Sequence, residues 1–348
     1  MSTYPLFDAF PKLQALPRAG LFEGVTPVAR LGDAQDVWVK RDDLSASDYG
    51  GNKIRKLDLL LADAAARGCR DLVTFGYSGS NFVAATAWHG RKLGLDTHAF
   101  LLPQAAAPYI GDNLATALHA RARLQVAPTE RAVATAAALR SARLLMRHRR
   151  WPQWIPPGGS TALGAIGFVN AAFELRHQVE AGLLPPPEQL YVAFSSMGSV
   201  AGLAIGLALA GLPTRIQAVQ VVGPQFASRA RLDRLVARTL RLLARHDPAA
   251  APNTVAPVDI RTEFFGRTYA VPTPATRQAM QRFEAATGAR SDSAYSGKAL
   301  ACLYADVDAG IPRGPALYWH TFNAHGRPEG VAPLPAKRLE GFIASDAD

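Results

Sequence analysis

The sequence predicts an α/β protein of two open, mostly parallel-sheet domains with helices on both faces. The chain has 348 residues, 49% of them hydrophobic, so it can bury a large core and is longer than most single domains. Short apolar segments alternate with longer segments of helical period along most of the chain. Strands that are separated by helices form parallel sheets with helices on both faces.

The first half of the chain begins with an irregular segment, residues 1–35, and then alternates between strands and helices. A strand over Val37–Lys40 leads through a Gly-Gly-Asn turn into a helix over Lys53–Arg67, which ends at Gly68. The elements expected next are a strand at Leu72–Phe75, a helix that ends at Leu93, a strand at Thr97–Leu102, a helix at Asn113–Arg123, a strand at Leu124–Val126 and a helix at Glu130–Arg149 with Thr129 as its N-cap.

A segment rich in proline and glycine, Trp151–Gly159, is the clearest break in the chain. Beyond it the alternation resumes, interrupted by a long loop at His246–Val258. The expected elements are helices at Ala162–Ala181, Ser199–Ala210, Pro274–Thr287 (N-cap Thr273) and Ser296–Ala309, and strands at Leu190–Phe194, Ile216–Val222 and Ala316–His320.

Charge and composition narrow the classes of function. The net charge is +10, but the arginines are scattered along helices and accompany no nucleic-acid-binding module, so we expect a charged surface and no nucleic-acid partner. Two cysteines, Cys69 and Cys302, make neither a disulfide framework nor a metal site. No signal peptide is visible, and the longest apolar stretch, Val200–Leu212, is too short to span a bilayer. We therefore expect a cytoplasmic protein without a membrane partner.

Lys53 is the strongest candidate for chemistry. It follows a Gly-Gly-Asn turn and opens a helix, where the N-terminal dipole disfavours an ammonium and so favours the neutral amine of a Schiff-base nucleophile. The chain has only seven lysines, which leaves few competitors for this role. The alternative interpretation is a solvated basic patch at the start of a surface helix.

Three strand-to-helix turns carry further polar groups. Ser195–Gly202 is rich in small residues, so its backbone N–H groups can converge on a phosphate, although neither GxGxxG nor GxxxxGK[ST] fits it. Gly76–Asn81 offers hydroxyl and amide donors for a carboxylate or a phenolic oxygen, and Asp292–Lys298 opens another helix with a tyrosine-serine pair. Each turn could also serve only helix capping or packing. Together with a lysine, they are the parts that a pyridoxal phosphate (PLP) enzyme requires.

Five segments of the chain, KRDDL, GGNKIRKL, PPGGSTALGAIGFVNAAFEL, SMGSVAG and SAYSGKAL, stand in the order and spacing of a known family. The sequence resembles the tryptophan-synthase-like (fold type II) PLP enzymes, in the branch of 1-aminocyclopropane-1-carboxylate deaminase and D-cysteine desulfhydrase. The resemblance implies PLP in a cleft between a large domain, residues 1–53 plus 161–348, and a small domain, residues 54–160. We also expect a homodimer that acts on a small amino acid.

The resemblance implies roles for individual residues. Lys53 matches the lysine that bonds to the cofactor, and Lys56 and Lys298 are then expected to be structural. The other matches are Asn81 at the pyridine 3′-oxygen, Ser80 at the substrate carboxylate, Ser196, Gly198, Ser199 and Ala201 in the phosphate loop, Tyr269 and Tyr295 facing the substrate, and Ser296 at the pyridine nitrogen. No metal is expected, because the histidines lack a partner set.

Ser296 separates two chemistries within the branch. The cyclopropane deaminases carry a glutamate at this position, whereas D-cysteine desulfhydrases carry a hydroxyl residue. A hydroxyl leaves the pyridine neutral, and this weaker electron sink suffices when a β-substituent leaves promptly. The sequence therefore favours elimination to a 2-oxo acid and ammonia over ring opening or β-replacement.

Some residues depart from the family pattern. Gly79, Phe82 and Phe322 replace polar or small residues near the expected substrate site, and Met197 and Val200 stand where threonines are usual. These departures motivate a competing hypothesis, a PLP-binding protein that has lost turnover.

Overall fold

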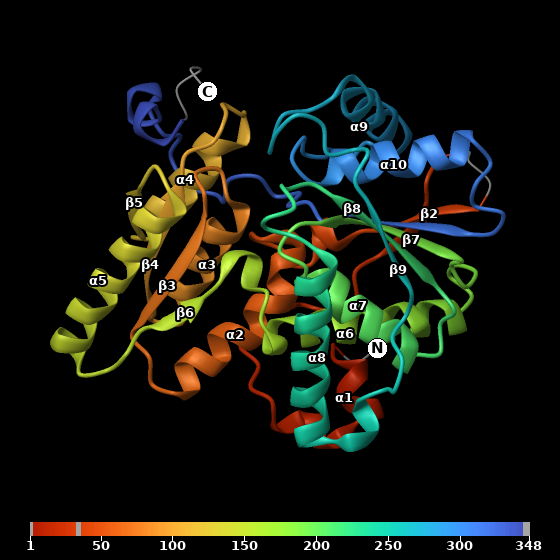
Figure 1. Cartoon of the computed structure of the whole chain (residues 1–348), viewed down its shortest axis with the longest axis horizontal. Coiled ribbons are helices and arrows are strands. Elements are labelled where there is room, and N and C mark those ends of the chain that lie inside the picture. The colour runs from red at the N-terminus through yellow and green to blue at the C-terminus, as the bar shows by residue number, and fades with distance from the viewer. Residues whose placement is uncertain (1–2, 33–35, 344–348) are drawn as a thin grey trace.

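The computed structural model describes residues 3–32 and 36–343 and contains two sheets (Figure 1). The six-stranded sheet has the order β1-β2-β10-β7-β8-β9, and only β1 is antiparallel to its neighbour. Its strands are β1 (Val28–Arg30), β2 (Val37–Lys40), β7 (Gln189–Phe194), β8 (Arg215–Gln220), β9 (Val258–Arg261) and β10 (Ala316–Trp319). The four-stranded sheet is parallel throughout in the order β5-β4-β3-β6, with β3 (Asp71–Tyr77), β4 (Asp96–Leu102), β5 (Arg123–Val126) and β6 (Gln153–Ile155).

Helices cover both faces of each sheet, which confirms the predicted fold class. On the larger sheet α9 and α10 lie on one face and α6, α7 and α8 on the other (Figure 1). On the smaller sheet, Val73 and Phe100 pack toward α5, whereas Leu72 and Ala99 pack in clusters with α2, α3 and α4. The helices are α1 (Pro5–Ala9), α2 (Ile54–Ala66), α3 (Asn81–Lys92), α4 (Tyr109–His119), α5 (Glu130–His148), α6 (Ala162–Glu180), α7 (Gly198–Leu209), α8 (Arg229–His246), α9 (Pro274–Thr287) and α10 (Ser296–Asp308).

Glycines in the apolar helices allow unusually close packing. A Cβ at Gly202 of α7 would lie 2.2 Å from the carbonyl oxygen of Ala165 in α6, and one at Gly167 of α6 would lie 1.9 Å from the carbonyl oxygen of Arg55 in α2. Real Cβ atoms do not approach carbonyl oxygens so closely, so larger side chains would force these helices apart. α6 is thereby held against both α2 and α7.

The prediction was wrong for several short elements. Residues 1–35 are not wholly irregular, since they contain α1 and β1, and the break at 151–159 contains β6. β9 follows the predicted loop, and α4 begins at Tyr109 instead of Asn113. The missed strands β1 and β6 have three residues each, too few to display a period of two. The predicted N-caps Thr129 and Thr273 are confirmed, because their side chains accept hydrogen bonds from Ala132 N and Thr276 N.

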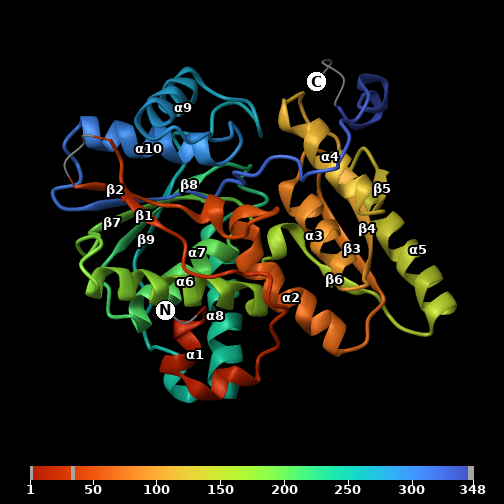
Figure 2. The ribbon, with the colours of Figure 1, turned by 180° about the vertical axis from the view of Figure 1, so that it is seen from behind.

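The boundaries of the two domains stay a prediction. α2 contributes Ile54 and Leu59 to the core of the large sheet and Leu57 and Leu61 to that of the small sheet, so it belongs to both. The C-terminal segment, assigned by prediction to the large domain, crosses to the small one. There Leu334, Leu339 and Phe342 pack beside α4 (Figure 2), and Ile343 pairs with Gln104.

Two expected absences concern membranes and metals. Among the described residues, no helix is both long and apolar enough to cross a membrane. Within the same residues, no group of three or more His, Cys, Asp or Glu side chains could hold a metal ion.

Candidate active site

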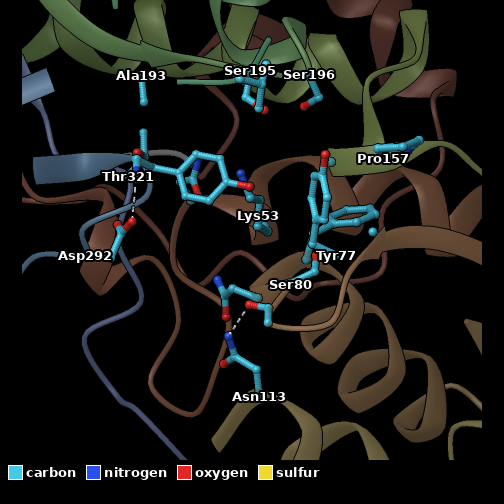
Figure 3. A pocket seen from close by; sticks show the side chains of 18 of the residues that line it. Lys53, Tyr77, Ser80, Asn113, Pro157, Ala193, Ser195, Ser196, Asp292 and Thr321 are labelled. Atoms are coloured by element: carbon cyan, nitrogen blue, oxygen red, sulfur yellow. Dashed lines mark hydrogen bonds between the residues drawn. The ribbon is translucent and has the colours of Figure 1, made fainter. Parts of the chain in front are cut away.

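A cavity of about 920 Å³ opens where the carboxyl ends of the parallel strands meet. Figure 3 shows side chains from several segments pointing into it, among them Lys53, Tyr77, Ser80 and Ser196. Most of the predicted site residues line it, namely Lys53, Ser80, Asn81, Ser196, Ser199 and Tyr295. Residues far apart in the sequence are therefore gathered around one space.

The backbone around Gly50 and Gly51 places Lys53 in the cavity. Both glycines have positive φ, 126° and 54°, and a Cβ at Gly51 would lie 1.8 Å from the carbonyl oxygen of Phe322. Only glycine at position 51 therefore allows this segment to lie so close to the backbone of Phe322. Lys53 then closes a short 3-10 helix and precedes α2.

The Lys53 amine is prepared for nucleophilic chemistry. In the described chain it has no hydrogen-bond partner, and Nζ lies 5.7 Å from the centre of the Tyr295 ring. Burial lowers the pKa of Lys53 to about 8, and the charge of Asp292 limits this fall. A substantial neutral fraction is thus present near neutral pH, as a Schiff-base lysine requires.

The lowered pKa predicts a pH dependence for cofactor attachment. Only the neutral amine attacks an aldehyde, so the rate at which cofactor-free protein captures PLP should rise with pH and level off above about 8. An ordinary lysine would continue to gain rate up to about pH 10.4. Stopped-flow absorbance of the protein-bound cofactor between pH 6 and 10.5 measures this rate. A midpoint near 10 would contradict the environment described for Lys53.

An anion-sized cradle lies at the N-terminus of α7. Ser160 Oγ donates to Ser196 Oγ (2.8 Å) and accepts from Gly198 N (3.1 Å). A Cβ at Gly198 would lie 2.6 Å from Ser160 Oγ and 2.8 Å from Lys56 Nζ. Met197 has a left-handed backbone, φ 68°, a conformation uncommon for a residue with a side chain. This turn directs the first N–H groups of α7 toward the cradle.

Lys56 is part of this cradle, which corrects the expectation that it is only structural. It is 1% exposed, and its Nζ donates a hydrogen bond to the carbonyl oxygen of Gly158 (3.1 Å). Burial and the charge of Lys53 lower its pKa well below the ordinary value. Among residues 3–32 and 36–343, no carboxylate pairs with Lys56. A buried amine of this kind beside a helix N-terminus suits a phosphate dianion. Lys298, by contrast, is structural: it donates to the carbonyls of Phe265 (2.6 Å) and Thr268 (3.3 Å).

Ser80 and Asn81 begin α3 at the edge of the cavity. Ser80 Oγ caps the helix by accepting from Val83 N (3.3 Å). Asn81 Nδ2 donates to the carbonyl of Gly50 (3.2 Å), while Oδ1 is buried and has no partner among the described residues. An unpaired buried oxygen favours a ligand that donates a hydrogen bond there.

Three tyrosines meet at the cavity: Tyr77 at the end of β3, Tyr269 in the loop between β9 and α9, and Tyr295 just before α10. Tyr269 OH lies 2.6 Å from Tyr295 OH, and the Tyr77 ring stacks on Tyr269 at 4.4 Å between centroids. Tyr269 therefore contacts Tyr77 and Tyr295, which line the cavity. Burial raises the pKa of Tyr295 to about 12 and raises that of Tyr269 well above its ordinary value. The phenols of Tyr269 and Tyr295 therefore hold their protons at neutral pH. Sequence reasoning missed Tyr77, although it ends a strand that was expected to lead into the site.

Ser296 and Ala201 make contacts that differ from the predicted ones. Ser296 is fully buried, donates to Asp292 Oδ2 (2.5 Å) and accepts from Asp292 N (2.7 Å). The Ser296 hydroxyl is thus hydrogen-bonded to a carboxylate, a partner that the sequence did not indicate. Ala201 is buried in the core, and its N–H donates to the carbonyl of Met197. The roles of both residues stay predictions, and these contacts give no support to that of Ala201.

The departures from the family pattern have structural partners. A Cβ at Gly79 would lie 2.8 Å from Tyr109 Cε2, and Gly79 N donates to Gln104 Oε1 (2.8 Å). Gln104 and Tyr109 thus fill the space that a side chain at position 79 would take. Phe82 is buried in the small-domain core, and Phe322 stacks on His320 at 5.7 Å.

A buried ionic network, Lys40, Asp42, Arg55 and Glu174, supports the start of α2 behind Lys53. Arg55 donates to Asp42 Oδ1 (2.7 Å) and Glu174 Oε2 (2.8 Å), and Lys40 donates to Glu174. All four side chains are at most 1% exposed. Although burial raises it, the pKa of Glu174 falls to about 2 because Arg55 and Lys40 stabilise the carboxylate. The network joins α2 to α6 and to the residues after β2.

The whole-chain comparisons agree with this site. Residues 20–321 match the family model described as "Pyridoxal-phosphate dependent enzyme". The chain belongs to this family. The enzyme is 34% identical over 342 residues to a protein named Nocardicin C-9' epimerase from Nocardia uniformis subsp. tsuyamanensis, with 93% of this chain and 98% of the relative covered. It is 33% identical to a D-cysteine desulfhydrase from Serratia proteamaculans (strain 568), with 90% and 96% covered.

A solved structure also matches the enzyme over nearly its full length. It is titled as an ACC deaminase homologue and has a TM-score of 0.79 at 27% identity, covering 94% of this chain and 96% of that chain. The site fits the family's cofactor. Ser196, Gly198, Ser199 and Lys56 would hold the phosphate, Lys53 the aldehyde carbon, and Asn81 a polar atom of the ring. The protein is a PLP-dependent enzyme.

Proposed function

We propose that the enzyme eliminates a β-substituent from a small amino acid, with D-cysteine as the model substrate. The observation that carries this proposal is an unpaired, partly neutral Lys53 facing Tyr295 and Ser80 in one cavity. The name of the D-cysteine desulfhydrase relative supports it. For D-cysteine the products would be pyruvate, ammonia and sulfide, with one water consumed.

Each step has a group of this chain to perform it. Bound PLP supplies an electron-withdrawing ring that accepts charge from the α-carbon. Ser80 and the first N–H groups of α3 bind the substrate carboxylate. Lys53, once its amine is free, removes the α-proton. The Tyr269–Tyr295 pair holds a proton that can pass to the departing sulfur as the Cβ–S bond breaks.

A second candidate function is epimerisation at the α-carbon. The relative named as an epimerase, at 34% identity, favours it. Epimerisation requires that a proton be added to the opposite face of the α-carbon. Tyr295, a neutral phenol beside Lys53, could donate this proton. Ring opening and β-replacement remain the alternatives weighed from the sequence.

Incubation with single amino acids in D₂O separates these functions. We expect D-cysteine to give equal amounts of 2-oxo acid, ammonia and sulfide. Chiral chromatography and mass spectrometry would detect an epimerase as inverted product carrying deuterium at the α-carbon, without keto acid. Keto acid from 1-aminocyclopropane-1-carboxylate alone would instead support ring opening. A holoenzyme whose absorption spectrum ignores the whole panel would contradict catalysis and favour a PLP-binding protein.

Cytoplasmic location and a homodimeric state are also part of the proposal. They rest on the composition and on the family resemblance. Large apolar side chains exposed on and just after α5, Leu139 (57%), Met146 (69%) and Trp151 (54%), support a subunit contact. Light scattering of the purified enzyme at micromolar concentration tests the dimer.

A further inference from the structure

One part of the cavity wall, here called the annex, lies on segments that carry none of the predicted cofactor residues. Its walls come from the C-terminal halves of β3 and β4 and from the first turns of α5. The annex residues are Phe75, Phe100, Leu102, Val133 and Ala134. These five are apolar, whereas Glu130, the first residue of α5, also lines the cavity. They belong to a part of the molecule that neither the cradle at α7 nor the Lys53 turn uses.

The annex and the catalytic lysine share one space. Lys53, Tyr77 and the annex residues line the same cavity of about 920 Å³, and Figure 3 shows Lys53 and Tyr77 pointing into it. Cavities for drug-sized ligands span about 300–1,000 Å³, so this one lies near the upper end. PLP together with a three-carbon amino acid is the size of a single small drug. The cavity therefore has room for a substrate larger than a three-carbon amino acid.

The annex walls are rigid and aromatic. The Phe75 ring lies 6.2 Å from that of Phe100 and 5.2 Å from that of Trp154, and Trp154 Nε1 donates to Ser141 Oγ of α5 (2.9 Å). Phe75 is therefore held between Phe100 of β4 and the indole of Trp154. An aromatic ring of a substrate could pack against Phe75 or Tyr77 in an offset or edge-on arrangement. This contact would remove apolar surface of the substrate from water. The thiol of cysteine is too short to gain this contact.

We infer that the annex binds the aromatic side chain of an amino-acid substrate, and that this substrate class is preferred over three-carbon amino acids. The inference rests on the proposed function, because it requires the amino and carboxylate groups to be held at Lys53 and Ser80. It changes the substrate class but not the chemistry at the α-carbon.

Titration calorimetry of the holoenzyme tests the annex without elimination. The ligands are alanine and phenylglycine, in both configurations, because neither carries a β-leaving group. We expect phenylglycine of the productive configuration to bind at least tenfold more tightly than the matching alanine. Ala134→Trp, which fills the annex from α5, should remove this preference, and Leu102→Phe should reduce it from the opposite wall.

Ala138→Trp is the matched control, since Ala138 is exposed one turn further along α5 and does not line the cavity. It should keep the wild-type preference. Equal affinities for phenylglycine and alanine would overturn the inference, as would a preference that survives both filling variants. If D-cysteine is turned over while phenylglycine gains nothing, only the annex proposal fails. If no amino acid binds or reacts, the proposed function fails with it.

Discussion

Replacement of Lys53 by alanine is expected to abolish covalent attachment of PLP and to lower kcat by roughly 10⁴-fold, the upper range for loss of a general base. In the described chain no other amine can take its place: Lys56 lies toward the phosphate cradle, and Lys298 is held by two carbonyls. The measurements are the visible absorption of the purified protein, mass spectrometry after borohydride reduction, and kcat with the substrate found in the amino-acid panel.

Lys56→Gln is the control for this experiment, because it removes a buried amine from the same turn of α2. We expect it to keep the visible band and the borohydride-labelled peptide that contains Lys53, while PLP dissociates more readily for lack of a cation at the cradle. A Lys53→Ala protein that still carried reducible, covalently bound cofactor would refute the assignment. Label on Lys56 in the wild-type protein would refute it equally.

The second large effect concerns stability. Glu174→Gln should lower the free energy of unfolding by about 3–5 kcal/mol, the usual cost of breaking a buried ion pair by removing one partner. Glu174 accepts from both Arg55 and Lys40, and all three side chains are at most 1% exposed. Without the charge of Glu174, the remaining hydrogen-bond partners of Lys40 in the described part of the chain are neutral: the Thr26 carbonyl and the Gln178 side chain. Urea unfolding at pH 7, followed by circular dichroism, measures the change.

Glu180→Gln is the matched control, since Glu180 lies on the same helix and is paired with Arg176 at the surface, 52% exposed. Its replacement should change stability by less than about 0.5 kcal/mol. Equal effects of the two variants would mean that the buried network contributes no more than a surface pair.

The pH dependence of stability gives a separate test of Glu174. The pKa of Glu174 is lowered to about 2 from an ordinary value of 4.5, so the folded state binds fewer protons than the unfolded state between these values. The stabilisation is therefore complete above about pH 4.5 and is lost as the pH falls toward 2. Glu174→Gln should be less sensitive to acid over this interval than the wild-type protein.

The Asp292–Ser296 contact bears on the choice between elimination and epimerisation. An isolated serine hydroxyl at position 296 would leave the pyridine nitrogen neutral, and on this ground the sequence favoured elimination. In the structure this hydroxyl donates a hydrogen bond to the carboxylate of Asp292, so its oxygen is a better acceptor than that of a free serine. At the predicted position of Ser296 beside the ring nitrogen, a better acceptor would favour a proton on that nitrogen, which is the direction that epimerisation needs.

The sequence by itself determined the fold class, most of the longer elements and the candidate lysine. These features depend on local patterns: helical and strand periodicity, N-caps such as Thr273, and the glycines that precede Lys53. Local patterns can be read without a partner, because they reflect the preferences of consecutive residues. The parallel arrangement followed from the alternation of strands and helices, and with it the expectation that polar turns meet at the strand ends.

Only the tertiary structure decided which side chains meet. The place of Lys56 in the cradle depends on Gly158 and Gly198, more than a hundred residues away, and Tyr77 at the end of β3 stacks on Tyr269 in the loop between β9 and α9. The short strands β1 and β6 exist because longer neighbours pair with them. The annex likewise arises from β3, β4 and α5 together. Such contacts depend on how distant segments pack, and neighbouring residues in the sequence carry no signal of them.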